Sequence, residues 1–255
     1  MWPSHSFPER IMSGHSHWAT IKRKKAATDA KKNKIFSKMA RAIMVAAKEG
    51  NPDPNLNIKL LFAVNEAKAA NMPKENIERA IKRGSGETGG AAFEEITYEG
   101  YGPKGTAILI ETLTDNRKRT APEMRRIFDS NGGKMGGANS VAYLFERKGI
   151  IRIPGNNTTE DDLMEAALEA GAENLETIED TFEVTTSPAE LNTVQKAIEE
   201  KFPVESSEFR MIPKNPNIVD PETGQKLMKL MDALDENDDV QRVYTDSAPE
   251  APPSA

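Results

Sequence analysis

The chain has 255 residues, enough for two or three compact domains, of which 37% are hydrophobic and 29% charged. No apolar run approaches the ~18 residues that a membrane-spanning helix requires, and the first twelve residues lack the apolar segment of a secretory signal, so we expect a cytoplasmic protein without a membrane partner. The absence of cysteine excludes disulfides, thiolate catalysis and cysteine-ligated zinc.

The net charge of −6 is distributed unevenly along the chain. Residues 13–83 hold sixteen Lys and Arg against six Asp and Glu, a net charge of +10, whereas residues 84–255 carry −16. Within the second part, residues 104–152 carry +5 and residues 153–255 carry −17. Concentrated positive charge near the amino end favours a polyanionic partner, although a solvated helix surface has the same pattern.

The first third of the chain has apolar residues at helical spacing. Ile35, Met39 and Ile43 recur within residues 28–49, and a glycine follows as a stop signal. Further helices are expected at 56–70, after a turn rich in Asn and Pro, and at 73–84, where proline opens the helix and glycine ends it. Three helices with short connections predict a basic helical bundle over 13–83. Residues 1–12 form an extension before it, and both Met1 and Met12 are candidate start residues.

After four glycines within residues 84–90, which predict a flexible junction, strands alternate with helices. We expect strands at 94–101, 106–114, 149–154, 173–178, 182–186, 205–212 and 241–244. We expect a helix that begins at Pro122, and others at 160–170, 189–202 and 222–234.

The order of these elements predicts an α+β fold, with an N-terminal three-helix bundle followed by two α/β domains. Residues 141–212 follow the β-α-β-β-α-β order of a ferredoxin-like domain, so at least one of the two is ferredoxin-like. The last helix and strand, within 213–245, have no partners in that unit. We therefore expect them to join residues 84–140 in a middle α/β domain into which 141–212 is inserted. Residues 246–255, rich in Pro, Ala and Ser, are expected to be a disordered tail.

A first basic group lies at the start of the bundle. Lys31, Lys34, Lys38 and Arg41, with Lys48 at the end of the helix, fall on one side of the first helix, away from the apolar stripe, so packing of the core would turn them outward. Like charges on one face repel one another unless an anion lies against them. Nucleic-acid phosphates would supply that anion and release counterions. An unoccupied solvent face, an acidic protein and membrane lipid are the alternatives.

A second basic group follows the strand 106–114. Three cations are expected at the strand exit, two more in the helix after it, and one in a mobile glycine loop over 131–137 that would let the backbone approach a ligand closely. An ordinary long connection would have the same composition. The candidate nucleic-acid-binding residues of both groups are Lys22, Arg23, Lys24, Lys25, Lys31, Lys34, Lys38, Arg41, Arg117, Lys118, Arg119, Arg125, Arg126 and Lys134.

Other motifs do not indicate chemistry. Residues 84–89 match G-x-G-x-x-G but follow a helix instead of a strand, which favours a linker over a dinucleotide site. His15 and His17 have neither cysteine nor a nearby carboxylate to complete a metal site, and Trp18 is better explained as a core residue than as a base-stacking one. No convergent set of titratable groups can be assembled. We therefore expect no catalysis, cofactor, metal or small-molecule substrate.

Several segments resemble the YebC/PmpR family, with their spacing preserved from Met12 to about Tyr244. They are 12–22 (MSGHSHWATIK), 34–38 (KIFSK), 71–81 (NMPKENIERAI), 98–103 (YEGYGP), 114–117 (TDNR), 119–120 (RT) and 140–145 (SVAYLF). The chain departs from the family's usual residues at His17, Lys104, Lys118 and Asn139. These exchanges keep the positive charge and bear on loop geometry.

The resemblance implies three domains around a concave face and no catalytic activity. Members look like transcriptional regulators that bind DNA, while others look like ribosome-associated factors that help translation through sequences such as consecutive prolines. The family also includes mitochondrial translational activators of cytochrome oxidase. The expected function is a non-enzymatic, DNA-binding regulator of transcription, with a ribosome-associated translation factor as the alternative. The partner would be DNA or RNA. A protein-interaction module and the oligomeric state are left open.

Overall fold

Three helices form the first unit of the computed structural model, which describes residues 29–87, 93–156 and 158–249. They are α2 (Asp29–Glu49), α3 (Ile58–Ala69) and α4 (Lys74–Gly84), with a 3-10 turn at Pro54–Leu56. Asn57 fixes the turn before α3, since its side chain accepts a hydrogen bond from the Leu60 amide and donates one to the Ala46 carbonyl. Ile43 and Leu60 are fully buried between the helices. The bundle core therefore consists of the apolar stripe that the sequence indicates.

The second unit is a four-stranded antiparallel sheet with two helices on one face. Its strands are β1 (Glu94–Tyr101), β2 (Ala107–Thr114), β3 (Lys134–Met135) and β9 (Val240–Thr245), in the order β3-β1-β2-β9. The helices are α5 (Arg117–Ser130) and α8 (Pro221–Asp235). Ile108 and Ile110 of β2 pack with Phe128 of α5 and Leu227 of α8 in one apolar cluster. The sheet thus joins β9 to strands that precede it by more than a hundred positions.

Helix α5 begins at Arg117, and the prediction that this helix begins at Pro122 is wrong. Asn116 is its N-cap, because the Asn116 side chain accepts a hydrogen bond from the Arg119 amide at 3.2 Å. The proline lies in the second turn of the helix instead of at its start. As a result, the cations expected at a strand exit belong to the first turn of α5.

The third unit has the predicted ferredoxin-like order. It comprises β4 (Phe145–Pro154), α6 (Glu160–Glu169), β5 (Asn174–Ile178), β6 (Thr181–Thr186), α7 (Leu191–Glu199) and β7 (Ser206–Pro213). All neighbouring strands are antiparallel, and the sheet order is β5-β6-β4-β7. Ile151 and Ile153 of β4 pack against Leu163 of α6 and Val194 of α7. The predicted α+β fold class is confirmed.

The end of the chain is partly structured, so the expectation of a disordered tail over 246–255 is wrong for its first residues. β10 (Ser247–Pro249) pairs in parallel with β8 (Asn217–Val219). The Asp246 carboxylate accepts a hydrogen bond from the Ala107 amide at 2.8 Å, and Ala248 is buried. These contacts provide the burial that its Pro-, Ala- and Ser-rich composition did not indicate. Residues 250–255 lie outside the described part of the chain.

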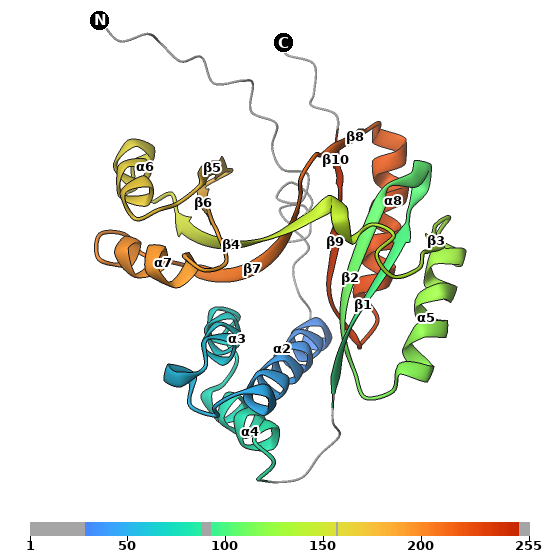
Figure 1. Cartoon of the computed structure of the whole chain (residues 1–255), viewed down its shortest axis with the longest axis horizontal. Helices are drawn as coiled ribbons and strands as arrows, with labels where there is room; N and C mark the ends of the chain where they lie inside the picture. The colour runs from blue at the N-terminus through green and yellow to red at the C-terminus, as the bar shows by residue number, and fades with distance from the viewer. Residues whose placement is uncertain (1–28, 88–92, 157, 250–255) are drawn as a thin grey trace, which may run out of the picture.

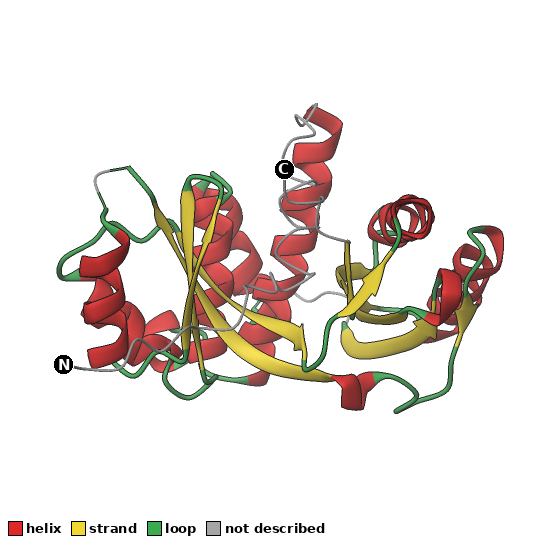
Figure 2. Ribbon diagram, turned by 90° about the horizontal axis from the view of Figure 1, so that it is seen from above, coloured by secondary structure: helices red, strands yellow, loops and turns green. Residues whose placement is uncertain are grey.

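The helical bundle lies against both α/β units, whose sheets are side by side along the molecule (Figures 1 and 2). Helix α3 packs on β7, where the rings of Phe62 and Phe209 meet edge to face at 5.0 Å. Phe62 is part of the apolar cluster of the third unit, although it belongs to the bundle. The contact between the bundle and the third unit is therefore apolar.

Two ion pairs that share one buried carboxylate link three strands of the third unit. Glu183 of β6 accepts hydrogen bonds from Arg152 of β4 at 2.7 Å and from Arg210 of β7 at 2.9 Å. Burial alone would raise the pKa of the Glu183 carboxyl, but the two guanidinium charges and their hydrogen bonds outweigh it and lower the pKa to about 2. The carboxylate therefore stabilises the folded state.

We expect this stabilisation to disappear in acid. Since the folded pKa of Glu183 is about 2 and its ordinary value 4.5, its contribution is complete above pH 4.5 and is lost as the pH falls toward 2. The loss is at most ~3 kcal/mol. Urea unfolding followed by circular dichroism at a series of pH values measures it. Glu183→Gln should lower stability at neutral pH and flatten the acid dependence. Glu165→Gln, at an exposed position of α6, should behave as the unsubstituted protein.

Candidate nucleic-acid interface

The first basic group is only partly within the described residues. Four of its members lie outside them: Lys22, Arg23, Lys24 and Lys25. Lys31 belongs to α2 by its backbone. The other three, Lys34, Lys38 and Arg41, follow one another at intervals of four and three residues and share one face of α2.

That face of α2 lies against the C-terminal end of α8. The Lys34 ammonium donates a hydrogen bond to the carbonyl of Glu236 and lies 3.9 Å from the Asp238 carboxylate. The Lys38 ammonium donates to the carbonyl of Asp235 at 2.7 Å and to its carboxylate at 3.1 Å. Two lysines of the bundle are thus paired with the acidic end of a helix in the middle unit.

Asp239 joins the two basic groups that the sequence analysis treated separately. Its Oδ1 accepts a hydrogen bond from Arg41 of α2 at 3.2 Å, and its Oδ2 accepts one from Arg119 of α5 at 2.7 Å. Thr120 donates to the same carboxylate at 2.7 Å. Burial would raise the pKa of Asp239, but the hydrogen bonds of Arg119 and Thr120 and the charge of Arg119 lower it. Asp239 therefore carries a negative charge between two arginines.

The expectation that Lys34, Lys38 and Arg41 turn outward, clear of the chain's acidic residues, is wrong. The side chains of Lys38 and Arg41 are only 15% and 21% exposed, and each contacts a carboxylate. Helical periodicity identified the face of α2 opposite the bundle core. It did not show that the end of α8, some two hundred positions later in the chain, covers that face.

Helix α5 presents cations that do face solvent. Arg117, Lys118, Arg125 and Arg126 are exposed, and among the described residues none of them has a carboxylate within ion-pair distance. Lys118 and Arg125 are seven positions apart and so lie on the same side of the helix. Arg119 differs, because Asp115 and Asp239 both accept its hydrogen bonds. The second basic group is therefore the more exposed of the two.

The glycine-rich segment after α5 is packed against β1, so the expectation of a mobile loop is wrong. Lys134 of β3 pairs with Tyr101 of β1. A side chain at Gly133 would come within 2.8 Å of the Tyr101 carbonyl. The segment is held further along by Glu99, whose buried carboxylate accepts hydrogen bonds from the amides of Asn139 and Val141 at 2.6 and 2.7 Å. The exposed Lys134 is thereby fixed just beyond the end of α5.

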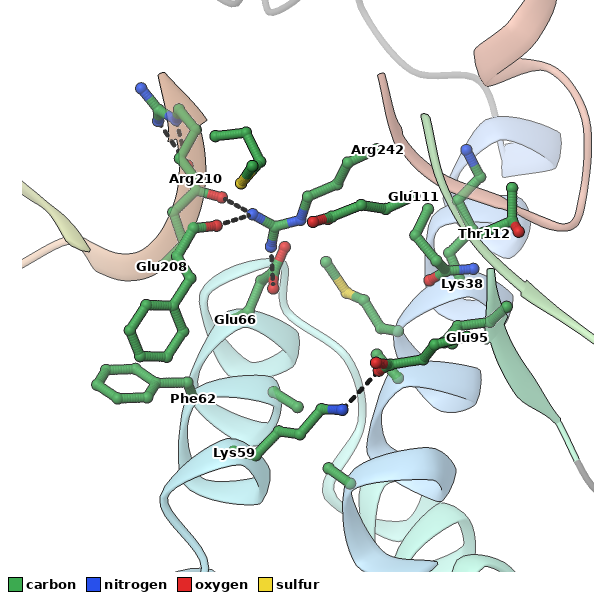
Figure 3. Close-up of a pocket in the computed structure, with 18 of the residues that line it drawn as sticks. Lys38, Lys59, Phe62, Glu66, Glu95, Glu111, Thr112, Glu208, Arg210 and Arg242 are labelled. Atoms are coloured by element: carbon green, nitrogen blue, oxygen red, sulfur yellow. Dashed lines mark hydrogen bonds and ion pairs between the residues drawn. The ribbon is translucent and has the colours of Figure 1, made fainter. Parts of the chain in front are cut away.

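A cavity of about 680 Å³ lies where the three units meet (Figure 3). Arg242 of β9 donates one hydrogen bond to Glu208 of β7 and another to Glu66 of α3, both at 2.7 Å. On another wall Lys59 contacts Glu95. The charged groups around the cavity thus pair with one another across the units. Arg242, at the cavity, and Asp239, between α2 and α5, were missed by the sequence analysis because their partners are distant in the chain.

Among the described residues, no group of three or more His, Asp and Glu could hold a metal ion, and no helix is long and apolar enough to cross a membrane. Of the 84–89 segment, Gly84 ends α4, where a side chain would collide with the Met44 backbone of α2. His15, His17 and Trp18 lie outside the described residues.

Two family models match the chain. The TACO1/YebC N-terminal domain matches residues 16–87, and the TACO1/YebC second and third domain matches residues 93–247. The chain belongs to the TACO1/YebC family. A relative named probable transcriptional regulatory protein, from Caldanaerobacter subterraneus, is 52% identical over 91% of this chain and 97% of its own. Another with that name, from Rubrobacter xylanophilus, is 53% identical over 91% and 94%.

The fold of the family is also known from a crystal structure. A conserved hypothetical protein from Aquifex aeolicus is 44% identical, with a TM-score of 0.84 over 93% of this chain and 98% of that one. The relatives of this chain carry the names of regulators of transcription and not of enzymes.

The Arg242 contacts generate a stability prediction. Arg242→Met removes the cation and leaves Glu66, which is 38% exposed, and Glu208, which keeps Arg210, so the free energy of unfolding should fall by ~1–3 kcal/mol. Lys59→Met, which removes a cation that is 41% exposed and pairs with Glu49 and Glu95, should cost only ~0–1 kcal/mol. Chemical denaturation of the three proteins measures both values. Equal losses would show that Arg242 is no more important than a surface lysine.

Proposed function

We propose that this TACO1/YebC protein is a DNA-binding regulator of transcription that acts in the cytoplasm. The observation that carries the proposal is a row of exposed cations, called the α5 row below, which have no carboxylate partners among the described residues: Arg117, Lys118, Arg125 and Arg126 of α5 and Lys134 of β3. The relatives' names point to transcription. A solvent-facing cation keeps its charge available for a phosphate, whereas a paired one must first lose its partner.

The row has dimensions that suit a nucleic-acid backbone. Helix α5 has 14 residues and is therefore ~20 Å long. Lys118 and Arg125 lie two turns apart on its outer side, and Lys134 follows beyond its end. A duplex carries one phosphate charge per ~1.7 Å of its axis, so several phosphates would lie within reach of this row.

Phosphate contacts determine affinity and position more than sequence preference. Lysine and arginine at phosphates neutralise charge and release counterions, but they do not read base edges. Lys22, Arg23, Lys24 and Lys25 would add further cations to the footprint. A ribosome-associated translation factor would use the same chemistry on RNA, and the binding experiment must therefore include both nucleic acids.

The experiment compares Lys118→Glu/Arg125→Glu with the unsubstituted protein, using fluorescence anisotropy on labelled DNA duplexes over a range of salt. The double variant should bind about tenfold or more weakly and have a shallower salt dependence, since each phosphate contact contributes ~0.9 to the slope. The matched control is Lys196→Glu/Lys201→Glu, which makes the same charge change at exposed positions in and just after α7 of the acidic third unit. The control should bind nearly as the unsubstituted protein does.

The outcomes separate the candidate functions. Equal weakening in both double variants would mean that net charge, and not the α5 row, governs binding, and would contradict the assignment. Protection of defined promoter sequences in a footprint would support regulation of transcription. Preferential binding to RNA, with co-sedimentation of the protein and ribosomes, would favour the translation factor instead.

A further inference from the structure

The C-terminal end of α8 has a charge distribution that is unfavourable by itself. Four acidic residues, Asp235, Glu236, Asp238 and Asp239, occupy the last position of the helix and the turn after it. A helix C-terminus already carries partial negative charge from its unpaired carbonyls, so carboxylates there are destabilising unless cations attend them. The segment 235–239, called the acidic turn below, therefore requires a positively charged partner.

The cations of α2 supply that positive charge. A nucleic acid could bind the same cations only by taking the place of the acidic turn. Lys34, Lys38 and Arg41 each contact one carbonyl and one carboxylate of the acidic turn. A phosphate backbone offers the same anionic oxygens. A lysine or arginine that holds the acidic turn cannot hold a phosphate with the same donors, so the two partners exclude each other.

The contact between α2 and the acidic turn is polar, whereas the contact between α3 and β7 is apolar. The buried apolar clusters of the bundle and of the middle unit have no residue in common within the described parts of the chain. Phe62 of α3, by contrast, belongs to the core of the third unit and meets Phe209 there. Helix α3 also meets the middle unit, through the ion pairs of Glu66 with Arg242 and of Lys59 with Glu95. An anion that competes for α2 would therefore open the contact with the acidic turn, with α3 as the pivot, and leave the apolar contact closed.

We propose that the acidic turn is an intramolecular competitor of nucleic acid for Lys34, Lys38 and Arg41, and that binding releases α2 from α8. The proposal rests on the nucleic-acid binding proposed above. It assigns two states to the bundle. In the closed state α2 is held by the acidic turn, and in the open state the three cations contact phosphates while α3 stays on β7. The exposed α5 row would make the first contact, because its cations need not break an ion pair.

The first test removes the competitor and keeps the cations. In Asp235→Asn/Asp238→Asn, the carboxylates that face Lys38 and Lys34 become neutral amides. Affinity for a mixed-sequence DNA duplex should rise about threefold or more above that of the control, because two partly exposed ion pairs no longer oppose binding. The control, Asp161→Asn/Glu165→Gln, makes the same charge change on the exposed side of α6. Circular dichroism should show that both variants are folded.

The second test measures the opening directly. The chain has no cysteine of its own, so spin labels will react only at the two cysteines that are introduced. One label at Ser85→Cys, after α4, is paired with Gln225→Cys on α8 or with Thr193→Cys on α7, all at exposed positions. Saturation with the duplex should lengthen or broaden the Ser85–Gln225 distance in electron resonance measurements and leave the Ser85–Thr193 distance unchanged.

Each result has one meaning. Tighter binding by the acidic-turn variant than by its control, with the Ser85–Gln225 distance altered, supports the competition. If the unsubstituted protein binds but the two neutralised variants bind equally, or the Ser85–Gln225 distance stays the same at saturation, the competition is wrong and the proposed function stands. If neither the unsubstituted protein nor any variant binds DNA or RNA at low salt, the proposed function fails, and the competition with it.

Discussion

The relative placement of the three units depends on a guanidinium that neutralises carboxylates from two of them. Arg242 extends from the middle sheet to Glu208 of the third unit and to Glu66 of the bundle. Glu208 is also bound by Arg210, which in turn binds Glu183, so charges alternate in sign from the cavity into the third sheet. A charge removed from water needs such neighbours. Loss of one member would leave its neighbours with fewer partners of opposite charge, which makes the junction a coupled system.

The two basic groups also differ in how many of their positive charges are free to meet a ligand. Lys34, Lys38 and Arg41 of α2 meet acidic residues of the chain itself. Most of the cations of α5 meet solvent instead, with Arg119 as the exception. The difference arises from tertiary contacts and not from composition, since both groups are similarly rich in Lys and Arg. In a chain with a net charge of −6, selective pairing of this kind decides which cations a polyanion encounters first.

The sequence was informative wherever local spacing determines structure. Apolar residues at helical spacing in α2, and the β-α-β-β-α-β order of the third unit, predicted the fold class. Local patterns misplaced the start of α5, because the Asn116 cap outweighs the proline signal, and missed β10, because its partner is β8. The role of Asp239 could not be predicted, since Arg41 lies about two hundred positions before it. Amphipathicity shows which face of a helix points away from the core, but it does not show which other part of the chain covers that face.

The late return of β9 to the sheet begun by β1 and β2 has a consequence for biosynthesis. As the chain leaves the ribosome, the third unit is complete once β7 has emerged, and it can fold while the sheet beside it still lacks an edge strand. Residues 94–135 must then wait for α8 and β9, with the inner face of β2 covered only by α5. Synthesis therefore imposes an order of assembly in which the segment inserted in the middle of the chain matures before the unit that surrounds it.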